Sequence, residues 1–388
     1  MKLGIAGIGV IGESYLKLFK EGRIKEGEVA AVASRNTQRV AKILEKLNLQ
    51  EVRVYGSLKE MLEKESLSGV IITTPHKLHV SMMKEALQMG VSVLTDKPLS
   101  STRKEAEEMA VFAKDYPDLV KGVLFNKRAN PIHKEIKKII ESGELGILRR
   151  ALYEVTDYYR SHRYYEESGW RGTYEEEGGG VLMNQAVHQM DLLTWFTDLP
   201  KEVMAFLNEG SHRPMTTEND AYLHLFYEGG GVGHFITSTH ESPGVHRLEL
   251  SFDQGQILME NEKTLKITKL QEPEEDFSRK TETLFAHVPG TLEVKEFEPL
   301  EDKEEHVRTI ENFIRTIEGK EKIQCSLEEA VKSITLVNAA YLSHFTGKKG
   351  AMDFSLEEYD RELHRKIQEE RALKEEKQTG KRMNLGSL

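Results

Sequence analysis

Residues 1–12 read MKLGIAGIGVIG, and this stretch decides the fold of the first part of the chain. A short apolar run, Lys2 to Ala6, predicts a strand. Three glycines follow with the spacing G-x-G-x-x-G, at Gly7, Gly9 and Gly12. The first permits a tight turn, the second lets backbone approach a pyrophosphate, and the third lets a helix pack on the strand. The stretch therefore predicts a strand, a turn and a helix that together bind a dinucleotide.

Val10 and Ile11 begin the predicted helix, and Tyr15, Leu16 and Phe19 continue its apolar face. The N–H groups of a first helical turn have no partner inside the helix, and the positive end of the helix dipole attracts anions. We therefore expect the backbone at Val10 and Ile11 to bind the phosphates of the dinucleotide.

The composition limits the class of protein. A chain of 388 residues exceeds what one hydrophobic core usually supports, so two domains are expected. The net charge of −10 argues against a nucleic-acid surface, and no apolar run approaches the roughly 18 residues that cross a bilayer. The single cysteine, Cys325, excludes an internal disulfide and a cysteine metal cluster, and it predicts a cytoplasmic protein.

Short apolar strands alternate with amphipathic helices over residues 1–125, which indicates parallel βαβ units. Six strands with their crossovers make a doubly wound α/β sheet, whose ligand crevice lies at the carboxyl ends of the strands. We expect a dinucleotide-binding domain at 1–125. The expected strands are Leu3–Ile8, Val29–Ser34, Val52–Tyr55, Val70–Thr73, Val91–Thr95 and Val120–Phe125.

The pattern changes after this point. Period-two alternation predicts half-buried strands, and the glycine-rich break at 228–231 predicts a hairpin. Ser326 and Glu329 have the spacing of a capping box and predict the start of a helix. We expect an α/β domain with a mostly antiparallel open sheet at 126–355, followed by an exposed charged helix and tail at 356–388.

The end of the second strand predicts the choice of dinucleotide. Folds that prefer NAD usually place an acidic residue there, which binds the ribose 2′-hydroxyl. This chain has Ser34 and Arg35, with Arg39 one helical turn later. A hydroxyl and two guanidiniums suit a 2′-phosphate, because charge-assisted contacts are strong. We expect NADP(H), with NAD(H) as the alternative; in that interpretation Arg35 stacks on the adenine and Arg39 is solvated.

Thr73, Thr74 and Pro75 end the fourth strand, and His76 and His79 follow. Two histidines three residues apart suggest a metal site, but no further ligand set accompanies them, so no metal is predicted. We expect Thr73, Thr74, Pro75 and His79 to form a wall beside the cofactor.

Asp96, Lys97 and Pro98 end the fifth strand, in the crevice where a cofactor is expected. A lysine there can donate to a substrate hydroxyl, and desolvation can shift its pKa. In the alternative interpretation Lys97 is a surface lysine in a turn. The local sequence favours neither.

A second group of polar residues follows the three glycines at 178–180. Asn184, His188 and Asp191 stand at i, i+4 and i+7 of a predicted helix and so share one face. A histidine titrates near neutral pH, which suits it to accept the proton of an alcohol as hydride leaves the same carbon. The alternative is a packed His188 that bonds within its own helix.

The motifs taken together resemble the Gfo/Idh/MocA oxidoreductases over residues 1 to about 350. No single motif is specific, but the set and its order are. The motifs are Gly7-x-Gly9-x-x-Gly12, Asp96-Lys97-Pro98, Arg128-x-Asn130-Pro131, and Gly178-Gly179-Gly180 with Asn184-x-x-x-His188-x-x-Asp191.

The resemblance implies a Rossmann domain and a second α/β domain whose open sheet often builds dimers or tetramers. It implies that Lys97 is the lysine of the family's usual Glu-Lys-Pro and that His188 is the general acid or base. It places Asp96, Lys97, Asn126 and Arg128 at the cofactor. The side chains that it places at the sugar pocket are Lys97, Trp170, Arg171, Asn184 and His188, with Tyr158 and Tyr159 as weaker candidates.

One departure from the family concerns Asn184, because many members carry Asp at this position. An amide orients an imidazole or a hydroxyl but holds no negative charge that would stabilise imidazolium. We therefore expect a lower pKa for His188 than in Asp-bearing relatives, with Asp191 supplying part of the missing charge.

The sequence thus predicts a cytoplasmic homo-oligomer that interconverts a secondary alcohol and a ketone on a sugar, polyol or cyclitol by hydride transfer. It predicts a small-molecule substrate and neither a nucleic acid nor a membrane as partner. Two alternatives remain open: a redox-cycling lyase or glycosidase that returns its cofactor unchanged, and a non-catalytic sugar or cofactor sensor. Binding alone requires neither Lys97 nor His188, which argues against the sensor.

Overall fold

The first 125 residues form a doubly wound parallel sheet, as the alternation of strands and helices predicts. The computed structural model describes residues 1–167 and 169–379. Its first sheet has the strand order β3-β2-β1-β4-β5-β6, so the order reverses between β1 and β4 and creates the expected crevice. The strands are β1 (Lys2–Ala6), β2 (Glu28–Ala33), β3 (Arg53–Tyr55), β4 (Gly69–Ile72), β5 (Ser92–Asp96) and β6 (Lys121–Leu124).

Helices cover both faces of this sheet. Two of them begin at capping side chains: Ser57 accepts from the N–H of Glu60, and Thr102 accepts from that of Glu105. The helices of this part are α1 (Val10–Lys20), α2 (Thr37–Lys46), α3 (Leu58–Lys64), α4 (His79–Gln88) and α5 (Arg103–Phe112), with short 3₁₀ turns η1 (His76–Leu78), η2 (Ala113–Asp115) and η3 (Asn126–Ala129).

A second, larger sheet follows, with the order β14-β13-β12-β11-β7-β10-β9-β8-β15. Only the β7–β10 pair is parallel among these neighbours, so the predicted antiparallel character is confirmed. The strands are β7 (Leu148–Val155), β8 (Glu202–Glu209), β9 (Glu218–Phe226), β10 (Val232–Ser238), β11 (His246–Phe252), β12 (Gly255–Glu260), β13 (Thr264–Leu270), β14 (Gly290–Glu296) and β15 (Gly350–Ala351).

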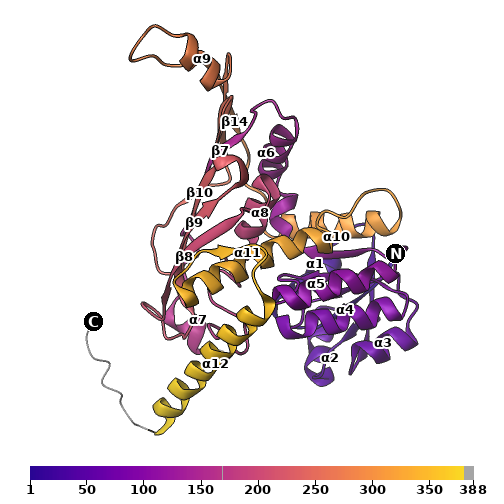
Figure 1. Ribbon diagram of the computed structural model, residues 1–388. Helices are drawn as coiled ribbons and strands as arrows, with labels where there is room; N and C mark the ends of the chain where they lie inside the picture. The colour runs from indigo at the N-terminus through magenta and orange to yellow at the C-terminus, as the bar shows by residue number, and fades with distance from the viewer. Residues whose placement is uncertain (168, 380–388) are drawn as a thin grey trace.

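The predicted hairpin joins β9 to β10 through the 3₁₀ turn η4 (Glu228–Gly230), where Gly229 has a positive φ of 74°. The long helix α11 starts where the capping box predicts, with Ser326 as its N-cap and Glu329 completing the box. Helices α8 and α11 pack on one face of the second sheet, and α11 also contacts α5 of the first part (Figure 1). The remaining helices are α6 (Pro131–Glu141), α7 (His162–Glu166), α8 (Val187–Thr197), α9 (Glu274–Lys280), α10 (Glu304–Ile317), α11 (Leu327–Thr346) and α12 (Leu356–Thr379).

Helix α10 lies next to the first sheet, although it comes late in the chain (Figure 1). Its buried side chains Val307, Ile310 and Phe313 share a core with Leu3 and Ile5 of β1. An amphipathic helix gains most of its stability by burying such a face. The core of the dinucleotide-binding part is therefore completed by a segment that lies far beyond residue 125.

The charged C-terminal helix α12 is packed against the protein, which corrects the expectation of a solvated helix. Tyr359 and Glu370 are each only 2% exposed. The carboxylate of Glu370 accepts the N–H of Tyr174 at 2.8 Å. Since Tyr174 lies just before the glycines at 178–180, α12 supports the loop that leads to the predicted site. Within the described ranges, no helix is long and apolar enough to cross a membrane.

Candidate active site

A pocket of about 410 Å³ lies at the carboxyl ends of β1, β2 and β4. This is the crevice at which doubly wound sheets bind nucleotides. Seven residues that the sequence predicts at the cofactor line it. They are Gly7, Gly9, Ser34, Arg35, Thr73, Thr74 and Pro75.

The glycine turn forms a cradle that a larger residue would fill. Gly7 has a φ of +94°, and a Cβ there would lie 2.7 Å from the Thr74 side chain. A Cβ on Gly12 would lie 2.3 Å from the carbonyl oxygen of Gly7, whereas Gly9 faces open space. Gly9 is also the N-cap of α1 and provides no side-chain cap, so the N–H groups of the first turn can bind an anion. This geometry fits a pyrophosphate.

The two arginines predicted at the ribose differ in position. Arg35 lines the pocket together with Ser34. Arg39 instead donates from its guanidinium to the carbonyl of Ile8 at 2.6 Å and lines a neighbouring groove. Arg35 can meet a ribose phosphate from its present position, whereas Arg39 must first leave the Ile8 carbonyl.

His79 lies behind the pocket wall, and its position corrects the predicted cofactor contact. The side chain is fully buried, with Nδ1 2.7 Å from the carbonyl of Pro98 and Nε2 2.8 Å from that of Thr74. Burial lowers the pKa of His79. The ring therefore connects the loop after β4 to the segment that carries Lys97. Neither ring nitrogen is free to bond to a cofactor.

Lys97, at the end of β5, meets the second part of the chain. Its Nζ donates to the backbone carbonyl of Asn184 at 2.5 Å and lies 3.3 Å from the Asn184 Oδ1. Burial lowers the pKa of Lys97, and the neighbouring carboxylates of Asp96 and Glu177 partly offset this effect. The structure thus excludes the alternative of a solvated lysine in a surface turn.

His188 lies in the first turn of α8, and its ring packs edge-on against Phe125 with centroids 5.9 Å apart. Burial lowers the pKa of His188 well below its ordinary value, and the cationic Lys97 and Lys127 lower it further. The imidazole is therefore neutral at pH 7. Its buried Nδ1 has no hydrogen-bond partner among the described residues, so the alternative of a histidine bonded within its own helix is wrong for this atom.

Asn184 precedes α8 rather than lying on it, since the helix begins at Val187. Residues 181–186 form turns, and the N–H of Asn184 donates to the carbonyl of Gly180 at 3.0 Å. The predicted common helical face of Asn184, His188 and Asp191 is therefore wrong. Asn184 reaches Lys97 through this turn.

Glu177 completes the environment of Lys97 and was not predicted. Its Oε1 accepts from Nδ2 of Asn184, and its Oε2 accepts the N–H of Gly172 at 2.6 Å. Burial raises the pKa of Glu177 to about 7, even though the hydrogen bonds from Gly172 and Asn184 oppose this shift. The only signal in the sequence was a carboxylate directly before the glycines at 178–180, which fits many loops equally well.

Asp191 does not supply charge to His188, contrary to expectation. Its two carboxylate oxygens accept from Nε and Nη2 of Arg128 at 2.7 and 2.8 Å, in a pair that is almost fully buried. The third guanidinium nitrogen donates to Glu329 at 2.8 Å. The predicted contact of Arg128 with a cofactor is therefore also corrected, because Asp191 and Glu329 together occupy all three nitrogens.

Asn126, which follows β6, is still able to contact a cofactor as predicted. Its Nδ2 donates to Glu305 of α10 at 2.8 Å, and its Oδ1 is buried without a hydrogen-bond partner among the described residues. A buried acceptor without a donor is costly unless a ligand satisfies it.

Tyr158, Trp170 and Arg171, which are predicted at the sugar pocket, lie in the segment between β7 and α8. Tyr158 donates to Gln189 at 2.9 Å, and Trp170 is 38% exposed. The Arg171 guanidinium lies 4.1 Å from the ring centre of Tyr164, a residue that was not predicted. Tyr164 also accepts from the side chain of Gln185 at 3.1 Å. Tyr159 is exposed and lies beneath the guanidinium of Arg213.

The comparison with known families agrees with this geometry. Residues 1–121 match the family described as "Oxidoreductase family, NAD-binding Rossmann fold", and residues 133–258 match the "GFO/IDH/MocA C-terminal domain". The chain belongs to the Gfo/Idh/MocA oxidoreductase family. The resemblance read from the motifs is confirmed.

Several curated Gfo/Idh/MocA proteins are similar to this chain. D-xylose 1-dehydrogenase (NADP(+)) 2 of Haloferax volcanii is 24% identical over 90% of this chain and 98% of that protein. Rhizopine catabolism protein MocA of Rhizobium meliloti is 27% identical over 50% of this chain, and the match covers only 57% of MocA. The scyllo-inositol 2-dehydrogenase (NADP(+)) IolW of Bacillus subtilis is 26% identical over 59% of this chain and 60% of that protein.

Two solved structures show the same fold. Levoglucosan dehydrogenase in complex with NADH and levoglucosan has a TM-score of 0.76 at 17% identity, over 90% of this chain and 98% of that chain. The WlbA dehydrogenase from Bordetella pertussis in complex with NADH and UDP-GlcNAcA has a TM-score of 0.73 at 21% identity, over 92% and 99% of the two chains.

Proposed function

We propose that this Gfo/Idh/MocA protein is an NADP(H)-dependent oxidoreductase that interconverts a secondary alcohol and a ketone on a sugar, polyol or cyclitol. The observation that supports it most strongly is the approach of Lys97, which follows β5, to His188, in the first turn of α8. The ammonium lies close enough to depress the pKa of the imidazole. A cation beside a neutral base is what alcohol oxidation requires.

Each side chain has a distinct role in this chemistry. A bound nicotinamide supplies the hydride acceptor or donor. His188 is neutral and takes the alcohol proton on a ring nitrogen, while the Nζ of Lys97 donates to the alcohol oxygen and stabilises its negative charge. The Asn184 carbonyl fixes the position of Nζ. In the reverse direction the same two groups return the proton to a ketone.

The cofactor residues follow from the pocket at β1, β2 and β4. The cradle at Gly7, Gly9 and Gly12 suits the pyrophosphate, and Ser34 and Arg35 present a hydroxyl and a guanidinium where a 2′-phosphate would lie. We infer a preference for NADP(H) over NAD(H). Two of the named relatives carry NADP(+) in their names, which agrees with this preference.

The Arg35→Ala variant tests the cofactor preference. We expect its dissociation constant for NADPH to rise while that for NADH changes little, since only NADPH carries the 2′-phosphate. Lys42→Ala, in the groove beside Arg39, is the matched control. Equal losses for both cofactors in Arg35→Ala would contradict the phosphate assignment.

The substrate class rests on the names of relatives, which include a xylose and an inositol dehydrogenase. A spectrophotometric screen should therefore cover aldoses, anhydrosugars, cyclitols and linear polyols with NADP⁺ and NAD⁺ in parallel. We expect NADPH formation with at least one cyclic sugar or cyclitol. Substrate turnover without net NADPH, together with tightly retained cofactor, would instead support a redox-cycling lyase or glycosidase.

We also propose that the protein forms a dimer or tetramer through the open face of its second sheet. On β8, Val203, Ala205 and Leu207 are buried, whereas Phe206 points the other way and is 61% exposed. Phe206 is the register partner of Tyr222 on β9, which is 43% exposed. Exposed aromatic pairs on a sheet face are typical of protein interfaces.

A further inference from the structure

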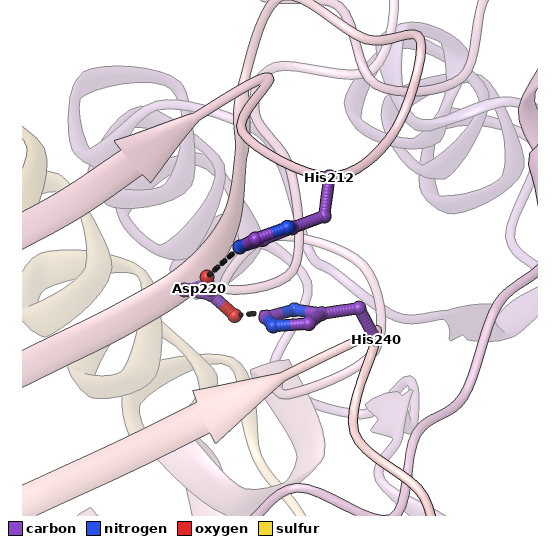
Figure 2. A group of neighbouring side chains, drawn as sticks. All are labelled: His212, Asp220 and His240. Carbon is purple, nitrogen blue, oxygen red and sulfur yellow. Dashed lines mark ion pairs between the residues drawn. The ribbon is translucent and has the colours of Figure 1, made fainter.

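Three side chains meet beside the second sheet, away from the Lys97 site. His212 lies in the loop between β8 and β9, Asp220 lies on β9, and His240 follows β10. Figure 2 shows both imidazole rings facing the two oxygens of the Asp220 carboxylate. The ligand-type atoms of the three residues all lie within 4.8 Å of one another.

The distances in this cluster suit ligands of a common ion. Nδ1 of His240 lies 2.9 Å from Oδ1 of Asp220, and Nε2 of His212 lies 3.9 Å from Oδ2. Nitrogen and oxygen ligands bind a divalent transition metal at about 2.0–2.2 Å, so neighbouring ligand atoms lie ~3–3.5 Å apart. The two rings are stacked, with centroids 3.9 Å apart, so His212, whose side chain is 50% exposed, must rotate for both imidazoles to bind one ion.

The buried carboxylate of Asp220 has few hydrogen-bond donors among the described residues. The residue is 2% exposed, and its Oδ1 has no hydrogen-bond partner among the described residues, although His240 lies beside it. The other oxygen, Oδ2, has two long contacts, 3.5 Å from the amide nitrogen of Asn208 and 3.9 Å from Nε2 of His212. A buried carboxylate with so few donors is costly unless a cation satisfies it.

We propose that His212, Asp220 and His240 bind a divalent transition metal ion, with Zn²⁺ as the favoured species. Two imidazoles and one carboxylate are borderline ligands that suit Zn²⁺ and its neighbours better than Mg²⁺ or Ca²⁺, which prefer oxygen. Water completes the coordination on the exposed side of His212. The Ser238 hydroxyl, now 2.9 Å from Nδ1 of His240, gives up that contact when the metal binds.

The ion would stabilise the segment after β7, which carries proposed sugar-pocket residues. The loop of His212 continues to Arg213, whose Nε donates to the carbonyl of Arg160 at 2.5 Å. The N–H of Arg160 donates to the carbonyl of Thr239, directly before His240, at 2.8 Å. A metal that joins His212 to His240 therefore stabilises both hydrogen bonds of the Arg160 backbone. Its role is structural and independent of the proposed oxidoreductase activity.

Zinc binding to the purified full chain tests the proposal. The protein is stripped with a chelator, dialysed and titrated with Zn²⁺ against a chromophoric competitor. We expect one tight Zn²⁺ per chain, and an affinity at least about 100-fold lower in His212→Ala and in His240→Ala. Zn²⁺ should also raise the thermal midpoint of the wild type but not that of His212→Ala.

His224→Ala is the matched control, because His224 and His234 form a second close pair, with Nδ1 atoms 3.3 Å apart. It should bind Zn²⁺ like the wild type. His212→Ala removes an exposed side chain, so a loss of binding in a variant with an unchanged circular dichroism spectrum cannot come from unfolding. No stoichiometric Zn²⁺ in the wild type, or equal loss in His224→Ala, would overturn the proposal.

Discussion

The buried carboxyl of Glu177 should make the stability of the protein depend on pH. Burial raises its pKa in the folded state from the ordinary 4.5 to about 7. The folded state therefore holds this proton more tightly than the unfolded chain, so the free energy of unfolding falls as the pH rises from 4.5 through 7. For these two pKa values, the loss between pH 5 and pH 8 is about 2.5 kcal/mol.

Glu177→Gln removes this loss, because a glutamine keeps the shape and the acceptor for the Gly172 N–H but carries no charge. Urea unfolding at pH 5 and pH 8 measures the effect. Between pH 5 and pH 8, we expect the free energy of unfolding to fall by about 2.5 kcal/mol more in the wild type than in the variant. Glu176→Gln, which removes an exposed neighbouring carboxylate, should change nothing. A wild-type pH dependence in Glu177→Gln, or the same gain in Glu176→Gln, would refute the reasoning.

Three further outcomes follow from the packing. Asp191→Asn leaves the Arg128 guanidinium buried with one charged partner fewer and should lower the free energy of unfolding by about 3–5 kcal/mol, seen as a lower urea midpoint. Gly12→Ala places a methyl group 2.3 Å from the Gly7 carbonyl and should weaken NADPH binding in a fluorescence titration. Gly22→Ala has open space but a strained φ of +68°, so it controls for a general loss of stability and should leave NADPH binding unchanged. Phe206→Glu should shift the mass measured by light scattering toward the monomer, and an unchanged mass would exclude this face as the interface.

Much of the first sheet was predictable because its signals are local. Each apolar run bounded by turn residues became a strand, and the glycines at Gly7 and Gly12 occupy positions where a Cβ would meet backbone. The helix start at Ser326 was equally local, since a capping box involves only four residues. The packing of α10 on this sheet was not predictable, because periodicity shows that a face is apolar but not which core receives it.

The site was predictable only in part. Motif order identified Lys97 and His188, which the structure places near each other. Spacing could not reveal that Asp191 and Arg128 are neutralised by a buried ion pair, because the two residues are far apart in the sequence. Glu177 and Asp220 were missed for a similar reason. The sequence does not show which isolated carboxylates are buried, because burial depends on the tertiary fold.

The most direct test of the central claim is the turnover of Lys97→Met and His188→Ala on the substrate found in the screen, at saturating NADP⁺ or NADPH. We predict that kcat falls roughly 10²–10⁴-fold in each variant, the usual contribution of a positioned acid or base. The dissociation constant of His188→Ala for NADPH should remain near that of the wild type. Wild-type turnover in either variant would contradict the assignment of these two residues to the alcohol chemistry.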